Sequence, residues 1–150
     1  MSTGIELPCL QMRLSAKPNR EALLEFIEQG AQRTIPREHH KPWLFATNPR
    51  NVLFLVNLAP AYARLEQPDI ITQFVRKFLE THHLGICGFV LEAKLLEEGK
   101  PTQSILTVII QEKDVPGVDM HVYRILGSEP ARALGECQTT KNVQTIWKFY

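Results

Sequence analysis

Apolar residues recur at helical spacing in the middle of the chain. Between residues 70 and 79 they fall at i, i+1, i+4 and i+5, and polar residues take the opposite side. Pro68 suits a first helical position and Gly85 suits a left-handed cap, so the pattern predicts a helix over Pro68–His83. Its single apolar face has to pack on another element. That face is formed by Ile70, Ile71, Phe74, Val75, Phe78 and Leu79.

An earlier helix is predicted over Asn19–Thr34. Asn19 precedes an apolar stripe, and its side chain can accept a hydrogen bond from an unpaired backbone N–H of the first turn. The Ile35-Pro36 dipeptide should end this helix, because a residue that precedes proline disfavours the helical backbone. The stripe consists of Leu23, Leu24, Ile27 and Ala31.

Two short runs rich in aromatic and β-branched residues, Trp43–Thr47 and Val52–Asn57, predict a β-hairpin. The residues between them, Asn-Pro-Arg-Asn at 48–51, have the chemistry of a turn. The second run is apolar at every position from Val52 to Val56, which is typical of a strand that is covered on both faces.

Alternating apolar residues after the Pro68–His83 helix predict a series of further strands. The run Ile105–Ile110 is apolar on both sides, so we expect it in the centre of a sheet. Short loops between consecutive strands favour an antiparallel meander. The predicted strands cover Phe89–Leu95, Ile105–Ile110, Met120–Ile125, a short segment Ala133–Gln138, and Val143–Phe149.

These elements predict a single α+β domain over residues 1–150. We expect a mainly antiparallel meander of roughly five to seven strands, with the two helices packed side by side on one face. The composition agrees, since 44% hydrophobic and 22% charged residues are ordinary for a globular domain.

The nearly balanced charge and the sparse cysteines narrow the classes of function. A net charge of +1 gives no indication of the concentrated basic surface that nucleic acid or an anionic membrane usually requires, although composition leaves a local basic patch open. The N-terminal residues lack the basic segment of a signal peptide, and no apolar run approaches the ~20 residues of a membrane-spanning helix. Three widely spaced cysteines, an odd number, are typical of reduced thiols, with the middle one buried in a strand. We therefore expect a soluble, cytoplasmic protein with free Cys9, Cys87 and Cys137.

Glu92 is the acidic residue with the most interesting context, because it lies in the middle of an apolar strand. If its face of the sheet were covered, burial would raise its pKa and make it a candidate acid or base. Asp119 and His121 could then converge on it from a neighbouring strand. The alternative is that Glu92 lies on an open face and pairs with Lys94 or with a cation of a facing strand.

The five histidines do not have the spacing of a metal site. His39-His40 and His82-His83 are adjacent pairs, and neighbouring residues on a helix point about 100° apart. His121 stands alone in a strand. The sequence also lacks the glycine-rich fingerprints of nucleotide-binding loops and the Gly-x-Ser-x-Gly elbow of hydrolases. We therefore predict no metal and no cofactor.

Trp43, Trp147 and Tyr150 are candidate binding residues, because exposed aromatic side chains anchor protein interfaces. The alternative for Trp147 is that it packs, together with Phe149, on the Pro68–His83 helix. With no catalytic motif, the sequence favours a non-catalytic module that binds a protein partner or associates with itself. The other hypothesis is a small enzyme or ligand-binding protein, with a pocket between helix and sheet that uses Glu92, His121 and Asp119.

Overall fold

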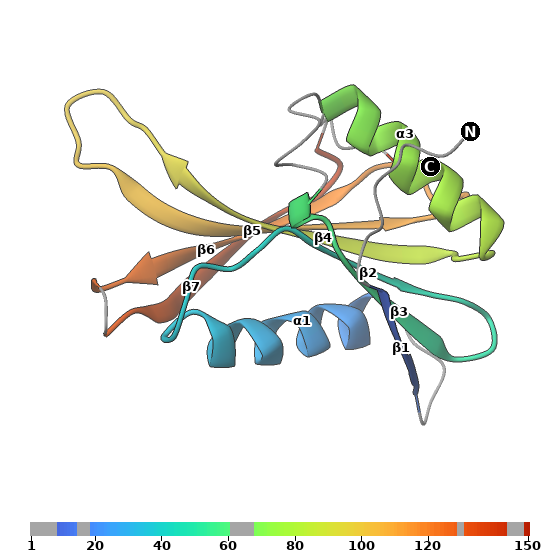
Figure 1. Cartoon of the computed structure of the whole chain (residues 1–150). Coiled ribbons are helices and arrows are strands. Elements are labelled where there is room, and N and C mark those ends of the chain that lie inside the picture. The colour runs from blue at the N-terminus through green and yellow to red at the C-terminus, as the bar shows by residue number, and fades with distance from the viewer. Residues whose placement is uncertain (1–8, 15–18, 61–67, 129–130, 144–148) are drawn as a thin grey trace.

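The computed structural model describes residues 9–14, 19–60, 68–128, 131–143 and 149–150 (Figure 1). Two helices and seven strands are assigned within these ranges. In chain order they are β1 (Cys9–Arg13), α1 (Arg20–Thr34), β2 (Trp43–Thr47), β3 (Val52–Asn57), α3 (Pro68–Thr81), β4 (Ile86–Leu95), β5 (Gln103–Glu112), β6 (Asp119–Leu126) and β7 (Ala133–Thr140).

All seven strands form one antiparallel sheet in the order β1-β3-β2-β4-β5-β6-β7. Strands β4 to β7 follow one another as a meander, and the β2–β3 hairpin joins it through β2 and β4. The predicted α+β class and the antiparallel meander are confirmed, and β2 and β3 have the predicted bounds. Strand β1 was not predicted. All five of its residues are exposed, although Leu10 and Met12 alternate with Gln11 and Arg13 in the sequence.

The two helices lie on opposite faces of the sheet, so the prediction that they share one face was wrong (Figure 1). Successive side chains of a strand point to opposite faces. In β2, Leu44 and Ala46 belong to the core under α3, whereas Phe45 between them belongs to the core under α1. Strands that are apolar on both sides have two faces to cover, and one helix covers each.

Each helix has its own core. The core on the α3 side joins three helix residues to both hairpin strands and to β4, and Phe149 packs there with its ring centroid 5.7 Å from that of Phe89. Cys87 is buried in this core, as predicted. The core on the α1 side includes the helix residues Leu23, Ile27 and Ala31 and the strand residues Val90, Leu106, Val108, Ile110, Tyr123 and Ile125.

The ends of α1 follow the local sequence. The Oδ1 atom of Asn19 accepts a hydrogen bond from the backbone N–H of Ala22 at 2.8 Å, which confirms Asn19 as the N-cap. The helix ends at Thr34, two residues before Pro36. Neither α1 nor α3 has the length and apolar character to cross a bilayer. Most of the predicted strand Val143–Phe149 lies outside the described residues.

Candidate functional site

The three predicted catalytic candidates lie on the same face of the sheet, the face that α1 covers. Their partners across the strand pairs all belong to the core under α1. Glu92 is opposite Leu106, His121 is opposite Val108, and Asp119 is opposite Ile110.

These three side chains nevertheless have separate partners. Arg20 Nη1 donates to Asp119 Oδ2 at 2.9 Å, and His121 Nδ1 lies 2.8 Å from the hydroxyl of Thr139. Tyr123 lies opposite Leu106, on the same face as the three candidates, and it donates to a carboxylate oxygen of Glu28 at 3.1 Å. Within the described residues, Glu92, Asp119 and His121 therefore form no common centre.

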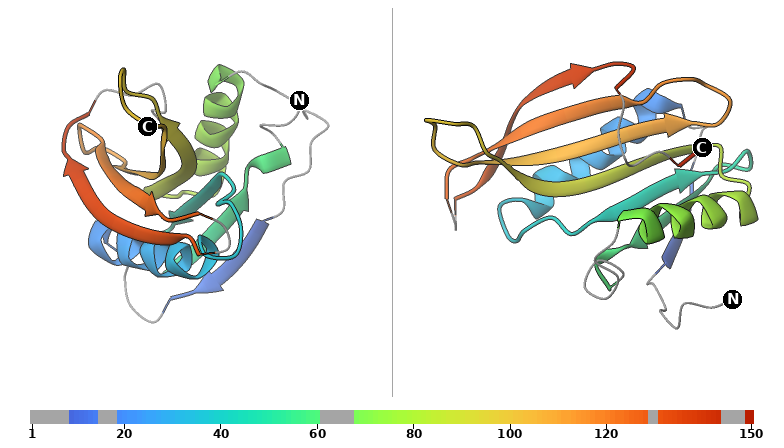
Figure 2. Two further views of the ribbon diagram at one scale, coloured as in Figure 1. Left: turned by 90° about the vertical axis from the view of Figure 1, so that its left-hand side faces the viewer. Right: turned by 90° about the horizontal axis from the view of Figure 1, so that it is seen from above.

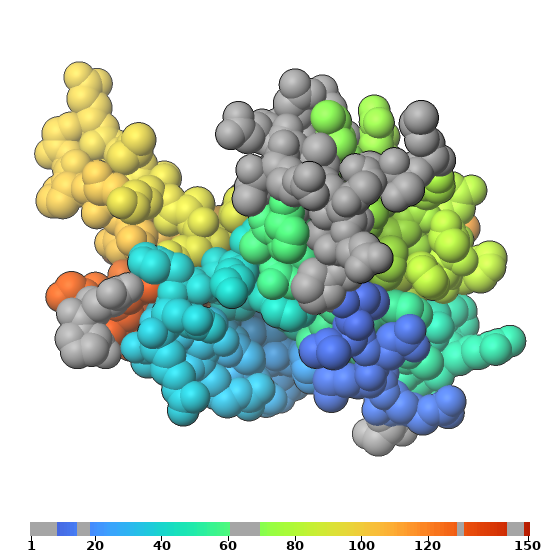
Figure 3. All heavy atoms as spheres, in the orientation of Figure 1, coloured from blue at the N-terminus to red at the C-terminus, as the bar shows by residue number. Residues whose placement is uncertain are grey.

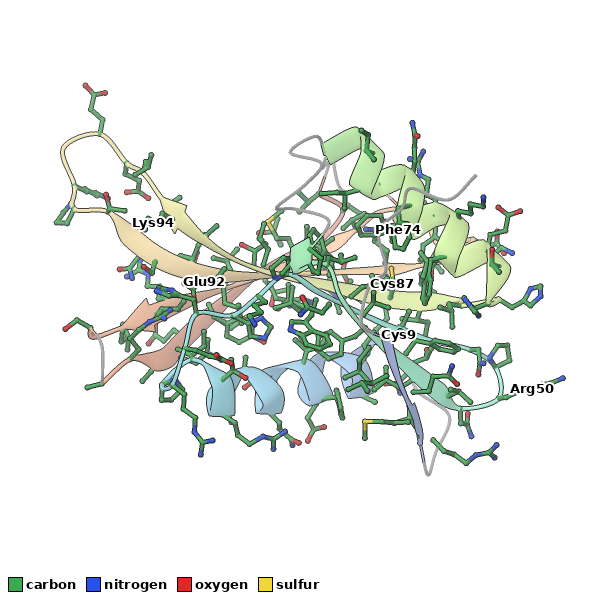
Figure 4. The ribbon with its side chains drawn as sticks, in the orientation of Figure 1. Cys9, Arg50, Phe74, Cys87, Glu92 and Lys94 are labelled. Carbon is green, nitrogen blue, oxygen red and sulfur yellow. The ribbon has the colours of Figure 1, made fainter. Side chains whose placement is uncertain are left out.

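Glu92, which is labelled in Figure 4, belongs instead to an ion cluster with Arg132 and the two histidines that precede β2. Arg132 Nη2 donates to Glu92 Oε1 at 2.5 Å, and the backbone N–H of His40 donates to the same oxygen at 3.1 Å. His39 Nδ1 hydrogen-bonds to the other carboxylate oxygen. The Glu92 and Arg132 side chains are only 12% and 5% exposed, so this is a largely buried ion pair.

The environment of Glu92 favours its ionised form. Burial raises the pKa of this carboxyl, but hydrogen bonds from His39, Arg132 and the His40 backbone, with the positive charge of Arg132, outweigh it and leave the pKa below its usual range. An ionised carboxylate held by an arginine has no proton to donate at neutral pH. A catalytic role for Glu92, Asp119 and His121 stays a prediction. No three His, Cys, Asp or Glu side chains of the described chain are grouped to hold a metal ion.

The predicted aromatic binding residues have different surroundings. Trp43 is half-buried in β2 on the α1 side, and its ring centroid lies 6.3 Å from that of Phe45. The hydroxyl of Tyr150 donates to the Leu84 carbonyl at 2.8 Å, so this side chain is tied to the segment between α3 and β4. Burial raises the pKa of Tyr150. Trp147 lies outside the described residues.

Among the described residues, no helix covers an apolar part of the sheet on the α3 side. Figure 2 shows α3 along one side of the sheet, with β5, β6 and β7 beyond it (right-hand view). The register continues this face from the buried Phe89 and Ile109 to side chains that are half-buried or exposed. We call this surface the open face. It consists of Ala93, Leu95, Ile105, Thr107, Met120 and Val122.

The open face extends onto the β4–β5 hairpin, which projects from the rest of the molecule in Figure 3. Leu95 is 41% exposed and its neighbour Leu96 is 77% exposed. The sequence does show apolar residues on both sides of β5, because Ile105 and Ile109 alternate with Leu106 and Val108. It predicted a strand buried on both sides, whereas only the half of β5 nearest α3 is buried in this way.

Comparison with known proteins identifies no relative: no family model, no curated protein and no solved structure matches this chain. A function therefore has to come from the residues and their geometry.

Proposed function

We propose that this chain is a non-catalytic protein-binding module, that the open face is its binding surface, and that a second copy of the chain binds there. One observation carries the proposal: five apolar side chains and one threonine on three neighbouring strands are left half-buried or exposed. Contiguous apolar patches on a protein surface mark sites of interaction.

The geometry of a sheet suits a symmetric partner. Two antiparallel sheets pack face to face about 10 Å apart, with their inner side chains interdigitated. A second open face brings the same apolar side chains, so a two-fold axis would bury both patches in one self-complementary interface. The exposed Arg124, which follows Met120 and Val122 along the same side of β6, supplies a charged rim.

Sedimentation velocity over a concentration series tests this proposal. We expect the wild-type chain to shift from monomer to dimer, and we expect Val122→Glu to remain a monomer because a carboxylate would be buried in the apolar interface. Gln73→Glu, at an exposed position of α3, is the matched control and should dimerise like the wild type. A wild-type chain that stays monomeric up to its solubility limit would contradict self-association.

The proposal includes a cytoplasmic location. The cysteines are free, and Cys9 and Cys137 are exposed, which suits a reducing compartment. Thiol labelling in intact cells, followed by mass spectrometry, should find both cysteines reduced. Stable oxidation of either one would contradict this location.

A further inference from the structure

We infer that a pocket between α1 and the β2–β3 hairpin binds a small planar aromatic acid. The pocket has a volume of about 300 Å³ and lies on the α1 side, across the sheet from the open face. Cavities of this size hold small ligands, and apolar walls with a few polar groups are typical of such sites. This inference does not depend on the proposed self-association.

Three aromatic rings form the apolar wall of this pocket, which we call the aromatic pocket. Phe45 is buried, and its ring centroid lies 6.0 Å from that of Phe26 in an edge-to-face arrangement. Trp43 continues the wall beside Phe45. Phe26 and Trp43 are half-buried, so part of each ring remains available to a ligand. Aromatic rings favour offset or edge-to-face contacts with another ring, and a flat ligand can make both.

Gly30 gives a second, independent indication of a ligand site. It lies inside α1, where glycine costs roughly 0.5–1 kcal/mol relative to alanine. A Cβ atom at this position would meet no atom within 4 Å, so the packing of the helix does not require a glycine here. Gly30 does line the aromatic pocket. We infer that glycine stands at this position because a larger side chain would fill the pocket.

Polar groups at the aromatic pocket specify the rest of the ligand. His40 is buried, and its Nδ1 donates to the Lys41 carbonyl at 2.8 Å, which leaves Nε2 as the hydrogen-bond acceptor of a neutral ring. Two cations, Arg33 and Lys41, line the pocket against the single carboxylate of Glu38. A ligand with an acidic substituent matches this excess of positive charge, and a ring N–H matches the acceptor on His40.

Isothermal titration calorimetry with three matched probes tests this inference. Indole-3-acetate has the ring, the N–H and the carboxylate. Indole-3-acetamide lacks the charge, and cyclohexylacetate lacks the aromatic ring. We expect indole-3-acetate to bind about tenfold more tightly than either of the others. Lys41→Glu should weaken the binding of indole-3-acetate and leave the affinity for indole-3-acetamide unchanged.

Two helix variants locate the binding site. Gly30→Leu places a side chain in the aromatic pocket and should reduce the affinity for indole-3-acetate about tenfold or more. The midpoint temperature of its thermal unfolding should be equal to or higher than that of the wild type, because leucine favours the helix. Gln32→Leu, at an exposed position of α1 outside the pocket lining, is the control and should bind normally.

Three outcomes would overturn the inference. One is the absence of heat with indole-3-acetate together with unchanged NMR signals of the Trp43 indole. Another is undiminished binding to a folded Gly30→Leu chain. The third is equal affinity for all three probes, because the aromatic acid would then have no advantage. None of these outcomes depends on whether the chain dimerises.

Discussion

Ile27 of α1 occupies the space that a side chain at Gly88 of β4 would need. A Cβ atom on Gly88 would lie 2.6 Å from Cδ1 of Ile27 and 3.0 Å from Cδ1 of Ile110. Because Ile27 is 1% exposed, it has little room to move aside. The glycine therefore lets α1 approach the centre of the sheet, on the face opposite α3.

This contact predicts how Gly88 and Ile27 depend on each other. Gly88→Val should lower the free energy of unfolding by about 1–3 kcal/mol, because it overpacks the core under α1. Ile27→Ala should lower it by about 2–5 kcal/mol. The free energy of unfolding of the double variant should fall by less than the sum of the two single effects, since the valine would fill the space that the isoleucine leaves. Urea denaturation measures all three.

Gly85 provides the control for this experiment. It precedes β4, and a Cβ atom there would meet nothing within 4 Å. Gly85→Val should therefore change the free energy of unfolding by less than about 0.5 kcal/mol. Strictly additive effects of Gly88→Val and Ile27→Ala would show that α1 does not lie over Gly88.

The ion pair between Glu92 and Arg132 predicts a large loss of stability when the carboxylate is removed. Glu92→Gln removes the negative charge that faces the buried guanidinium of Arg132 in this ion pair, so the free energy of unfolding should fall by about 3 kcal/mol. Glu98→Gln, at an exposed position of the β4–β5 loop, is the matched control and should stay within about 0.5 kcal/mol of the wild type. Chemical denaturation at pH 7 measures both.

A double variant separates the charge effect from a loss of packing. In Glu92→Gln/Arg132→Met the arginine charge is absent, so the double variant should be more stable than Glu92→Gln alone. Equal or lower stability of the double variant would mean that the buried charge is not the cause.

Glu92 also predicts a loss of stability in acid. Its pKa is lower in the folded chain than the ordinary value of 4.5, so the unfolded chain binds protons more readily. The contribution of Glu92 is complete above pH 4.5 and is lost as the pH falls through the folded pKa. Urea midpoints measured from pH 7 downwards should fall less steeply in this range for Glu92→Gln than for the wild type. Parallel curves would contradict this assignment.

The buried histidines predict a further loss of stability, at a higher pH than the loss due to Glu92. Burial lowers the pKa of His40 and of His121 below the ordinary 6.5, although carboxylates near each partly oppose this effect. The unfolded chain therefore takes up these protons first, and stability should fall as the pH drops through 6.5. His121→Asn should flatten this part of the curve of urea midpoint against pH. A curve for His121→Asn that runs parallel to that of the wild type would contradict this assignment.

Local sequence was sufficient to predict most of the elements. The cap at Asn19 and the turn at residues 48–51 act on their immediate neighbours, and α1, β2 and β3 agree with prediction within one residue. Strand β1 was not predicted, although the short alternation of Leu10 and Met12 with Gln11 and Arg13 is a strand pattern. The placement of the two helices on opposite faces was not predicted either. Alternation in β4 shows that each face has apolar positions, but it does not show which helix covers which face.

The candidate site depended on contacts that are distant in the sequence. Glu92 was singled out by its apolar neighbours, but its arginine partner is 40 residues further along the chain. No local pattern links Arg132 to β4. The sequence predicted Glu92, Asp119 and His121 on strands of one sheet but left open whether they share a face, and the structure puts them on one face. Their separate partners depend on the position of α1 and of the segment that carries His39.

The most direct test of the account is whether the open face is exposed in the monomer and covered in the dimer. Methyl NMR with a soluble paramagnetic agent reports this for Ile105 and Val122, with the buried Ile71 and Val75 as internal references. We predict that the open-face methyl signals broaden strongly at low protein concentration and are protected at high concentration. Broadening that is equal at both concentrations, or protection at both, would contradict the account.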